Sequence, residues 1–191
     1  GSTFNRCWGI DVQGISGREG QSLFPVARTD DILAGFYVKE DGKVGPVNVT
    51  LALAKGARLQ GATLLENTPA TGIVTKRGVV TGVETALGTI EAEYVVNCTG
   101  IWARQLGARA GVNIPLQAAE HYYLITDKVP GMSSSFPVIE DPGSYGYYRE
   151  EVGGLMIGLF EPVCAPWKVG GIPEDFSFGE ITPDWDRMGP Y

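Results

Sequence analysis

The sequence predicts a mixed α/β fold of the α+β type, built from a few helices and many short strands. Two apolar stretches have the spacing of amphipathic helices, whereas most other apolar runs are short and rich in β-branched or aromatic residues. The 27 glycines and 12 prolines predict frequent turns between these runs. Antiparallel strands joined by turns are therefore expected to make up much of the chain.

The N-terminal part gives a mixed signal. Trp8–Ile15 is a candidate strand, and Ser16 followed by Glu19 has the spacing of a capping box that begins a turn or short helix ending at Phe24. Three glycines follow a GxxGxxG spacing, which differs from the GxGxxG dinucleotide fingerprint, and we interpret them as loop: Gly14, Gly17 and Gly20.

The next part predicts a strand, a turn and a helix. Ile32–Val38 alternates enough for a strand, and Asp41-Gly42 supplies a turn after it. Pro46 suits the first position of a helix whose apolar stripe runs as far as Gly61. This stretch is one of the two predicted amphipathic helices.

Two candidate strands, Ala62–Glu66 and Tyr94–Asn97, flank a predicted antiparallel excursion. Ala62–Glu66 follows directly after a predicted helix, and Tyr94-Val95-Val96 is an uninterrupted apolar run, so the two are expected to be strands of one parallel layer. The excursion is a three-stranded meander with turns at Arg77-Gly78 and Leu87-Gly88. Its strands are Thr71–Lys76, Val79–Thr85 and Thr89–Glu93.

The second predicted helix follows directly after Tyr94–Asn97. Trp102, Leu106 and Ala110 recur at helical spacing, and Gly111 is placed to end the helix in a left-handed conformation. The turn before this helix contains Gly100, whose missing Cβ would let a phosphate approach the helix N-terminus. An ordinary strand-to-helix turn explains the same residues, so both interpretations stay open.

The C-terminal part predicts an antiparallel sheet as a second layer. Its three candidate strands are Leu116–Thr126, Tyr145–Arg149 and Leu155–Phe160. Pro162–Pro183 has no periodicity, and no secondary structure is expected there.

Charge and cysteine content exclude several classes of protein. The formal charge of −7 and 15 scattered basic residues argue against a nucleic-acid partner. No segment is long and apolar enough for a membrane span, and we expect a cytoplasmic protein, or a mitochondrial matrix protein in a eukaryote. One histidine and three isolated cysteines predict no metal site and reduced thiols. Cys98 is expected to be a packed, inert thiol rather than a nucleophile.

Several polar and aromatic side chains share alternate positions on two predicted strands. His121 would lie on one face with Tyr123, and the next strand carries Tyr145, Tyr147 and Arg149 in the same alternation. If these residues of the two strands lie on the same side of the sheet, the Arg can bind a small carboxylate. The Tyr and His side chains can then offer a hydrogen bond or take up a proton. An aromatic sheet face with a satisfied histidine is the alternative.

Several stretches together resemble the glycine-oxidase-like flavoenzymes of the D-amino-acid oxidase superfamily, especially the dimethylglycine and sarcosine dehydrogenases. The matching stretches, in chain order, are Leu23-Phe24-Pro25, DGKVGPVNVTLALAKGARLQGA (Asp41 to Ala62), GVETALGTIEAEYVVNCTGIWARQLG (Gly82 to Gly107), EHYYLIT (Glu120 to Thr126) and YYRE (Tyr147 to Glu150). Several motifs in one order are more specific than any single motif.

This resemblance implies part of an FAD-binding Rossmann-like domain plus an antiparallel-sheet substrate domain. The expected parts are a connecting segment of the substrate domain at 3–40, the partial FAD-binding domain with its inserted meander at 41–112, and the substrate-binding sheet at 113–191. The cofactor-binding residues that it implies are Ala70, Cys98, Thr99, Gly100 and Trp102. It also implies His121 and Tyr147 as catalytic residues, with Arg149, Tyr123 and Tyr145 as substrate-binding residues.

The implied reaction is oxidation of a small N-methylated amino acid by hydride transfer to FAD. The chain lacks the GxGxxG segment that would hold the pyrophosphate, so we expect an internal fragment that binds FAD weakly or not at all by itself. A non-catalytic binding module that keeps part of the fold is the alternative function. A relative that acts on another small amino acid or on a glycerol phosphate is a third. The sequence leaves the oligomeric state open.

Overall fold

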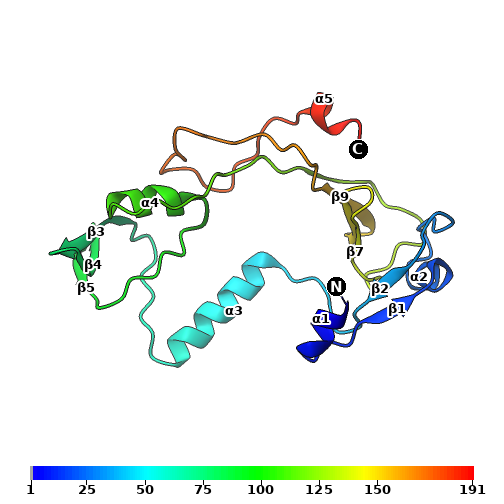
Figure 1. Cartoon of the computed structure of the whole chain (residues 1–191), viewed down its shortest axis with the longest axis horizontal. Helices are drawn as coiled ribbons and strands as arrows, with labels where there is room; N and C mark the ends of the chain where they lie inside the picture. The colour runs from blue at the N-terminus through cyan, green and yellow to red at the C-terminus, as the bar shows by residue number, and fades with distance from the viewer. Residues whose placement is uncertain (1) are drawn as a thin grey trace. The chain divides into compact units, whose positions relative to one another are not determined.

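The computed structural model describes residues 2–191 and confirms a fold of helices and antiparallel sheets (Figure 1). Backbone contacts divide the chain into two compact units. The first unit contains the chain up to Pro46, His121–Pro162 and Asp184–Tyr191, and the second contains Val47–Glu120 and Val163–Pro183. The domain boundaries expected from the sequence stay a prediction, because contact units and functional domains need not coincide.

The first unit is built on a four-stranded antiparallel sheet with the strand order β6-β9-β8-β7. Its strands are β6 (Tyr123–Ile125), β7 (Ile139–Asp141), β8 (Gly146–Glu151) and β9 (Gly154–Leu159). The strand expected at Leu116–Thr126 is shortened to β6, because the pairing with β9 covers only its last part. Strand β7 was not predicted, since Pro137 and Pro142 flank a run too short to give a periodic signal.

The turn between β8 and β9 places a β-branched residue in a left-handed conformation. Val152 has φ 51° and Gly153 has φ 84°, the two positive values that a tight hairpin turn requires. We expect Val152→Asn to raise the free energy of unfolding by about 1 kcal/mol, because asparagine tolerates this conformation better than valine. Urea denaturation measures the change. Val163→Asn, at another exposed valine, is the control, and an equal gain there would contradict this explanation.

The capping box predicted at Ser16 is confirmed. Glu19 N donates to Ser16 Oγ at 3.3 Å, and Ser16 N donates to Glu19 Oε2 at 2.7 Å, which begins helix α2 (Gly17–Leu23). The loop interpretation of the GxxGxxG glycines was wrong, because Gly17 and Gly20 lie in α2 and Gly14 lies in β1 (Gln13–Ile15). A Cβ on Gly17 would lie 2.8 Å from the Thr29 carbonyl oxygen, so close backbone packing explains that glycine.

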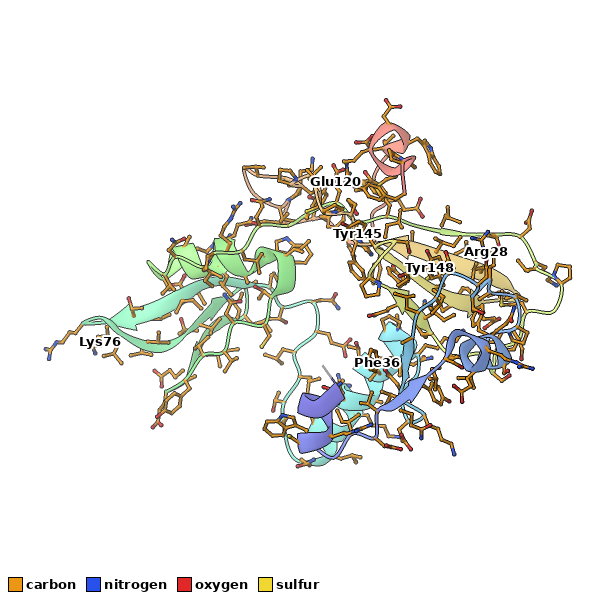
Figure 2. The ribbon with its side chains drawn as sticks, turned by 45° about the vertical axis from the view of Figure 1, so that its right-hand side comes forward. Arg28, Phe36, Lys76, Glu120, Tyr145 and Tyr148 are labelled. Carbon is orange, nitrogen blue, oxygen red and sulfur yellow. The ribbon has the colours of Figure 1, made fainter. Side chains whose placement is uncertain are left out.

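A small hairpin accompanies α2 in the first unit. Strand β1 pairs antiparallel with β2 (Gly35–Tyr37), so both predicted strands exist but are shorter than expected. The turn after β2 comes slightly earlier than predicted, since Asp41 N donates to the Val38 carbonyl. A cavity of about 610 Å³ is lined by residues of this hairpin, of α2 and of the sheet, among them Phe36 and Tyr148 (Figure 2). The helix α1 (Ser2–Cys7) precedes the hairpin.

The C-terminal residues belong to the first unit through helix α5 (Trp185–Met188), which was not predicted. Asp184 caps this helix by accepting a hydrogen bond from Arg187 N at 3.1 Å. Arg187 Nη1 pairs with Glu161 Oε1 at 2.5 Å, and its guanidinium lies 5.4 Å from the centre of the Tyr122 ring. Charge pairing and ring contact therefore anchor the end of the chain.

The second unit confirms the predicted meander and both predicted helices. Its elements are α3 (Pro46–Leu59), β3 (Ala70–Lys76), β4 (Val79–Thr85), β5 (Gly88–Glu91), the 3-10 turn η1 (Gly100–Trp102) and α4 (Ala103–Arg109). Arg77 and Gly78 both have positive φ, as the hairpin turn requires, and Figure 2 shows Lys76 at the tip of this hairpin. Gly111 ends the α4 region with φ 73°, as predicted.

The two strands expected to form a parallel layer are absent from the part of the chain that the structure describes. Ala62–Glu66 and Tyr94–Asn97 have no ladder partner among residues 2–191, and a strand exists only through such a ladder. Tyr94 is 86% exposed and Val96 is 80% exposed. Cys98, which follows this segment, is exposed as well. The prediction of a packed thiol was wrong, because it assumed that Tyr94–Asn97 is a covered strand.

The irregular segment predicted at Pro162–Pro183 is held by side chains of α4 and of the turn η1 that precedes it. Gln105 makes a reciprocal pair with Ile172, in which Nε2 donates to the carbonyl and Oε1 accepts from the amide, both at 2.9 Å. Trp102 Nε1 donates to the Pro173 carbonyl at 3.0 Å. Arg109 pairs with Glu174 at 2.6 Å. These bonds replace the secondary structure that the segment lacks.

Candidate functional site

Strand register places three of the predicted site residues, Tyr123, Tyr147 and Arg149, on one face of the sheet. Tyr123 and Tyr147 both lie opposite Gly158, and Ile125 and Arg149 both lie opposite Met156. Directly opposed residues of antiparallel strands point to the same side, and because this side carries residues predicted from the sequence to be catalytic, we call it the catalytic face. Tyr148 lies on the other side and lines the cavity instead.

His121 and Tyr147 are in direct contact on this face. His121 Nε2 lies 3.1 Å from the Tyr147 hydroxyl, and the two rings stack with centroids 5.9 Å apart and an interplanar angle of 13°. Phe160 packs against both rings at 5.2 Å. Sequence reasoning missed Phe160 as a site residue, although its place at the end of the predicted strand was a usable signal.

A glycine makes room for the Tyr147 ring. A Cβ on Gly158 would lie 1.9 Å from Tyr147 Cζ, so the ring lies directly over the β9 backbone. Burial of the ring raises the pKa of the Tyr147 hydroxyl above its usual value of 10.0, an effect that Arg149 opposes and Tyr123 reinforces. The phenol is therefore protonated at neutral pH and can donate to an unprotonated His121 Nε2.

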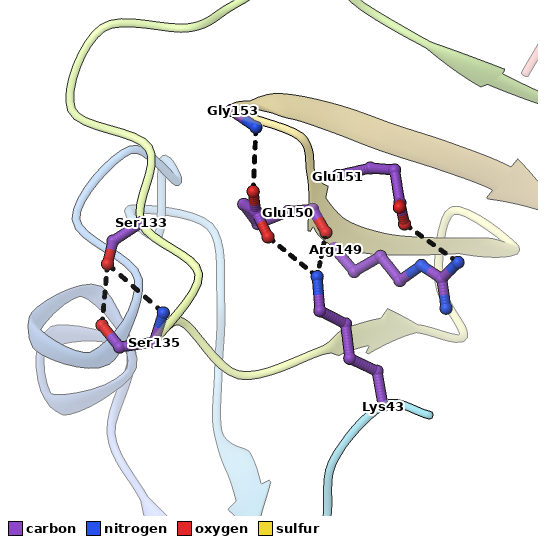
Figure 3. A network of polar contacts seen from close by, with 7 residues as sticks. All are labelled: Lys43, Ser133, Ser135, Arg149, Glu150, Glu151 and Gly153. Atoms are coloured by element: carbon purple, nitrogen blue, oxygen red, sulfur yellow. Dashed lines mark hydrogen bonds and ion pairs between the residues drawn. The ribbon is translucent and has the colours of Figure 1, made fainter. Parts of the chain in front are cut away.

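Arg149 extends the catalytic face by one alternate position along β8. Its Nη2 pairs with Glu151 Oε2 at 3.1 Å, as Figure 3 shows, and its side chain is 28% exposed. Its Nε is buried without a hydrogen-bond partner. The guanidinium therefore has an unsatisfied N–H donor, the kind of group that donates to a carboxylate.

Tyr145 is separated from the His121 and Tyr147 pair. It lies before β8 with φ 58°, and its ring contacts the Tyr191 ring edge-on at 5.9 Å. The positive φ turns this residue out of the strand alternation that the sequence pattern assumed. Its substrate-binding role stays a prediction.

Glu150 fixes the segment before α3 to the back of the same strand. Lys43 Nζ donates to Glu150 Oε2 at 2.8 Å, and Gly153 N donates to Oε1 at 2.8 Å (Figure 3). The hydrogen bond from Lys43, followed by that from Gly153, lowers the pKa of Glu150 below 4.5. Strand β8 thus presents a positioning contact on one side and the catalytic face on the other.

This lowered pKa predicts a specific acid response. Stability from ionised Glu150 is fully present above the unfolded-state pKa of about 4.5 and is lost as pH falls through the lower folded-state pKa. We expect Glu150→Gln to lower stability at pH 7 and to make stability depend less on pH below about 4.5. Urea denaturation at several pH values tests this, with exposed Glu40→Gln as control. Parallel pH curves for wild type and Glu150→Gln would contradict it.

The predicted cofactor-binding residues lie in the second unit. Ala70 begins β3 opposite Thr85, and Thr99 donates from both its amide and its hydroxyl to Asn97 Oδ1, at 3.3 and 2.8 Å. Gly100 has φ 57°, and no atom lies within 4 Å of where its Cβ would be. Cys98, between Asn97 and Thr99, is exposed.

These residues fit one wall of a dinucleotide site. The open backbone at Gly100 permits close approach, and the Asn97 bonds hold the turn in shape. The sequence contains no GxGxxG segment, so the residues that cradle a pyrophosphate are not supplied by this chain. Trp102 uses its indole N–H on the Pro173 carbonyl, which fixes the ring beside the turn.

Within residues 2–191, no three His, Cys, Asp or Glu side chains are grouped so that they could hold a metal ion. No helix in the same range combines the length and apolarity that crossing a bilayer requires.

The helices and antiparallel sheets, with His121 and Tyr147 in contact beside one sheet face, are the features to compare with known proteins. Residues 2–188 match the DAO family, described as FAD dependent oxidoreductase. The chain belongs to this family of FAD-dependent oxidoreductases.

Relatives with known names agree with this assignment. The chain is 33% identical to human mitochondrial sarcosine dehydrogenase over 96% of its own length, and 36% identical to rat mitochondrial dimethylglycine dehydrogenase over 87%. It is also 36% identical, over 95% of its length, to the mouse mitochondrial pyruvate dehydrogenase phosphatase regulatory subunit. The chain spans 20%, 20% and 21% of these three proteins, or about a fifth of each.

Solved structures show the same fold. L-proline dehydrogenase from P. horikoshii matches 96% of this chain with a TM-score of 0.76 and 24% identity, and the match covers 47% of that chain. Glycine oxidase from Geobacillus kaustophilus matches 89% of this chain with a TM-score of 0.58 and 26% identity, and the match covers 46% of that chain.

Proposed function

We propose that the chain is part of an oxidoreductase that oxidises a small N-methylated amino acid of the dimethylglycine or sarcosine type. The contact between His121 and Tyr147, at 3.1 Å on the open catalytic face, carries this proposal. FAD, when bound, supplies the hydride acceptor. The similarity to sarcosine and dimethylglycine dehydrogenases supports the substrate class.

The chain's own residues would bind and orient the substrate. Arg149 would hold the carboxylate through its guanidinium, which has a buried Nε without a partner. Tyr147 and His121 would take up or release the amine proton at the phenol oxygen and the ring nitrogen. The Phe160 ring, packed on both, would help to hold the two rings in place.

Anaerobic flavin bleaching tests the proposal in the complete FAD-loaded protein that carries this chain. Sarcosine or dimethylglycine is expected to bleach the flavin, whereas glycine, L-proline and glycerol 3-phosphate bleach it more slowly. Tyr147→Phe is expected to lower kcat/KM by about 100-fold, because the donor is lost from the His121 pair. Ser144→Ala, on the cavity side, is the control. If neither sarcosine nor dimethylglycine bleaches the flavin, the proposal is refuted.

A non-catalytic binding module is the second candidate function. The similarity to a protein named as a regulatory subunit favours it, because that match is as high as those to the dehydrogenases. FAD content of the complete protein separates the two candidates, since a module of this kind would purify without stoichiometric flavin. The mitochondrial names of the relatives support a matrix location in a eukaryote.

A further inference from the structure

The cavity on the side of the sheet opposite to the catalytic face has the size of a small-molecule site. Its volume is about 610 Å³, which falls within the range of roughly 300–1,000 Å³ typical of ligand pockets. Its walls come from α2, from the hairpin of β1 and β2, from the loop between α2 and β2, and from the sheet. All of these belong to the first unit, so the cavity depends on one compact unit only.

Contacts within the chain hold these walls in place. The Tyr148 ring lies against Gly146, where a Cβ would be 2.3 Å from the Tyr148 hydroxyl oxygen, and that hydroxyl lies 3.2 Å from Ser144 Oγ. Phe24 is 3% exposed and packs on Phe136 with ring centroids 5.1 Å apart. The cavity is therefore formed before a ligand binds, as in most small-molecule sites.

The lining is mainly apolar and is rich in aromatic rings. Four aromatic side chains contribute to it, and Figure 2 labels two of them: Phe24, Phe36, Tyr37 and Tyr148. Phe36 is 72% exposed although it lines the cavity. An apolar ligand would remove this surface from water, and a flat ring is suited to packing against other rings.

One carboxylate of the lining has no basic partner. Asp141 lies opposite Gly146 and therefore on the same side of the sheet as Tyr148. The hydrogen bond from the Ser144 side chain, followed by that from the Gly143 amide, lowers the pKa of Asp141 below its usual 3.8, so the carboxylate is ionised at neutral pH. The ion pairs formed among residues 2–191 do not include Asp141.

The other charges at the cavity favour a cation over an anion. Arg28 is the basic residue of the lining, and its Nε pairs with Asp30 at 2.7 Å while its Nη2 lies 3.8 Å from Asp31. Glu140 also borders the cavity, but it lies opposite Tyr147, so its side chain points to the catalytic face. The Asp141 carboxylate therefore attracts an ammonium group, and no free guanidinium attracts a carboxylate.

We propose that this cavity binds a small aromatic amine in its protonated form. The ring of the amine would pack among Phe36, Ile139 and Leu155, and the ammonium group would pair with Asp141. Such a ligand carries no carboxylate, so it differs from the substrate of the proposed reaction. The inference stands for the catalytic and the non-catalytic candidate alike.

Titration of this chain with phenethylamine at pH 7, followed by NMR, tests the proposal. We expect saturable binding at one site, with shifts of the Tyr148 ring and Leu155 methyl signals and none of the Tyr147 or His121 ring signals. The matched probes 3-phenylpropionate and 2-phenylethanol carry a carboxylate and a neutral hydroxyl in place of the ammonium group. Each is expected to bind at least about tenfold more weakly. Ethylamine lacks the ring and is expected to show no binding.

Two variants locate the two ends of the ligand. Asp141→Asn keeps an acceptor for the Gly143 amide but removes the charge, and it is expected to weaken phenethylamine binding by about tenfold without changing 2-phenylethanol binding. Phe36→Ala is expected to weaken the binding of both compounds. Asp11→Asn and Leu33→Ala change exposed residues outside the lining and are the controls.

Three results would overturn the proposal. The first is no saturable binding of phenethylamine, and the second is equally tight binding of 3-phenylpropionate or 2-phenylethanol. The third is a phenethylamine affinity that Asp141→Asn and Phe36→Ala both leave unchanged, because the amine would then bind elsewhere on the chain.

Discussion

Replacement of Arg187 with alanine is expected to lower the free energy of unfolding of the first unit by about 3–5 kcal/mol. The Arg187 side chain is 18% exposed and that of its partner Glu161 is 2% exposed, and the two charges lie 2.5 Å apart. Removing the guanidinium leaves the Glu161 carboxylate buried without a counter-charge. That desolvation cost exceeds the loss of an exposed ion pair several-fold.

Two further variants separate this explanation from a simple loss of packing. Arg187→Met combined with Glu161→Leu removes both charges and is expected to recover most of the lost stability. Asp184→Asn removes the more exposed partner of Arg187 and is expected to lower stability much less than Arg187→Ala. Urea denaturation of the four proteins measures the differences. If Arg187→Ala costs less than about 1 kcal/mol, the pair is solvated and the explanation is wrong.

Local sequence signals predicted those elements whose stabilising contacts are themselves local. The capping box at Ser16 and the turn at Arg77-Gly78 each depend on residues a few positions apart. The prediction of a parallel layer at Ala62–Glu66 and Tyr94–Asn97 was wrong. The residue pattern indicates that a segment is suited to a strand, but it does not show whether a partner strand is present. Helix α5 was missed because one turn is too short to show a period.

The candidate site was predictable where strand alternation holds and unpredictable where it breaks. Alternation placed His121, Tyr147 and Arg149 on one side, and the observed register brings the first two into contact. Tyr145 departs from the pattern because a positive φ turns it before the strand begins. Glu151, two residues along the same strand, pairs with Arg149, and its spacing is the signal that predicts such a pair. The assigned roles of all these residues stay predictions.

The two faces of the sheet offer a matched pair of glycine substitutions. Gly158→Ala would place a Cβ 1.9 Å from Tyr147 Cζ on the catalytic face, and Gly146→Ala would place one 2.3 Å from the Tyr148 hydroxyl on the cavity side. Each conflict involves a side chain and not backbone, so the ring moves and the sheet remains. We therefore expect small stability changes in both variants and different functional effects.

Gly158→Ala is expected to displace the Tyr147 ring from β9 and to break its 3.1 Å contact with His121. Because burial is the main cause of the raised pKa of Tyr147, that pKa should fall toward 10.0 in an NMR titration of this chain. In the complete FAD-loaded protein, kcat/KM should fall by about 100-fold, the typical effect of misplacing a reacting group by roughly 1 Å. Gly146→Ala should leave both quantities unchanged, since Tyr148 lies on the opposite face. Equal losses in the two variants would mean that the sheet, and not the Tyr147 ring, supports the reaction.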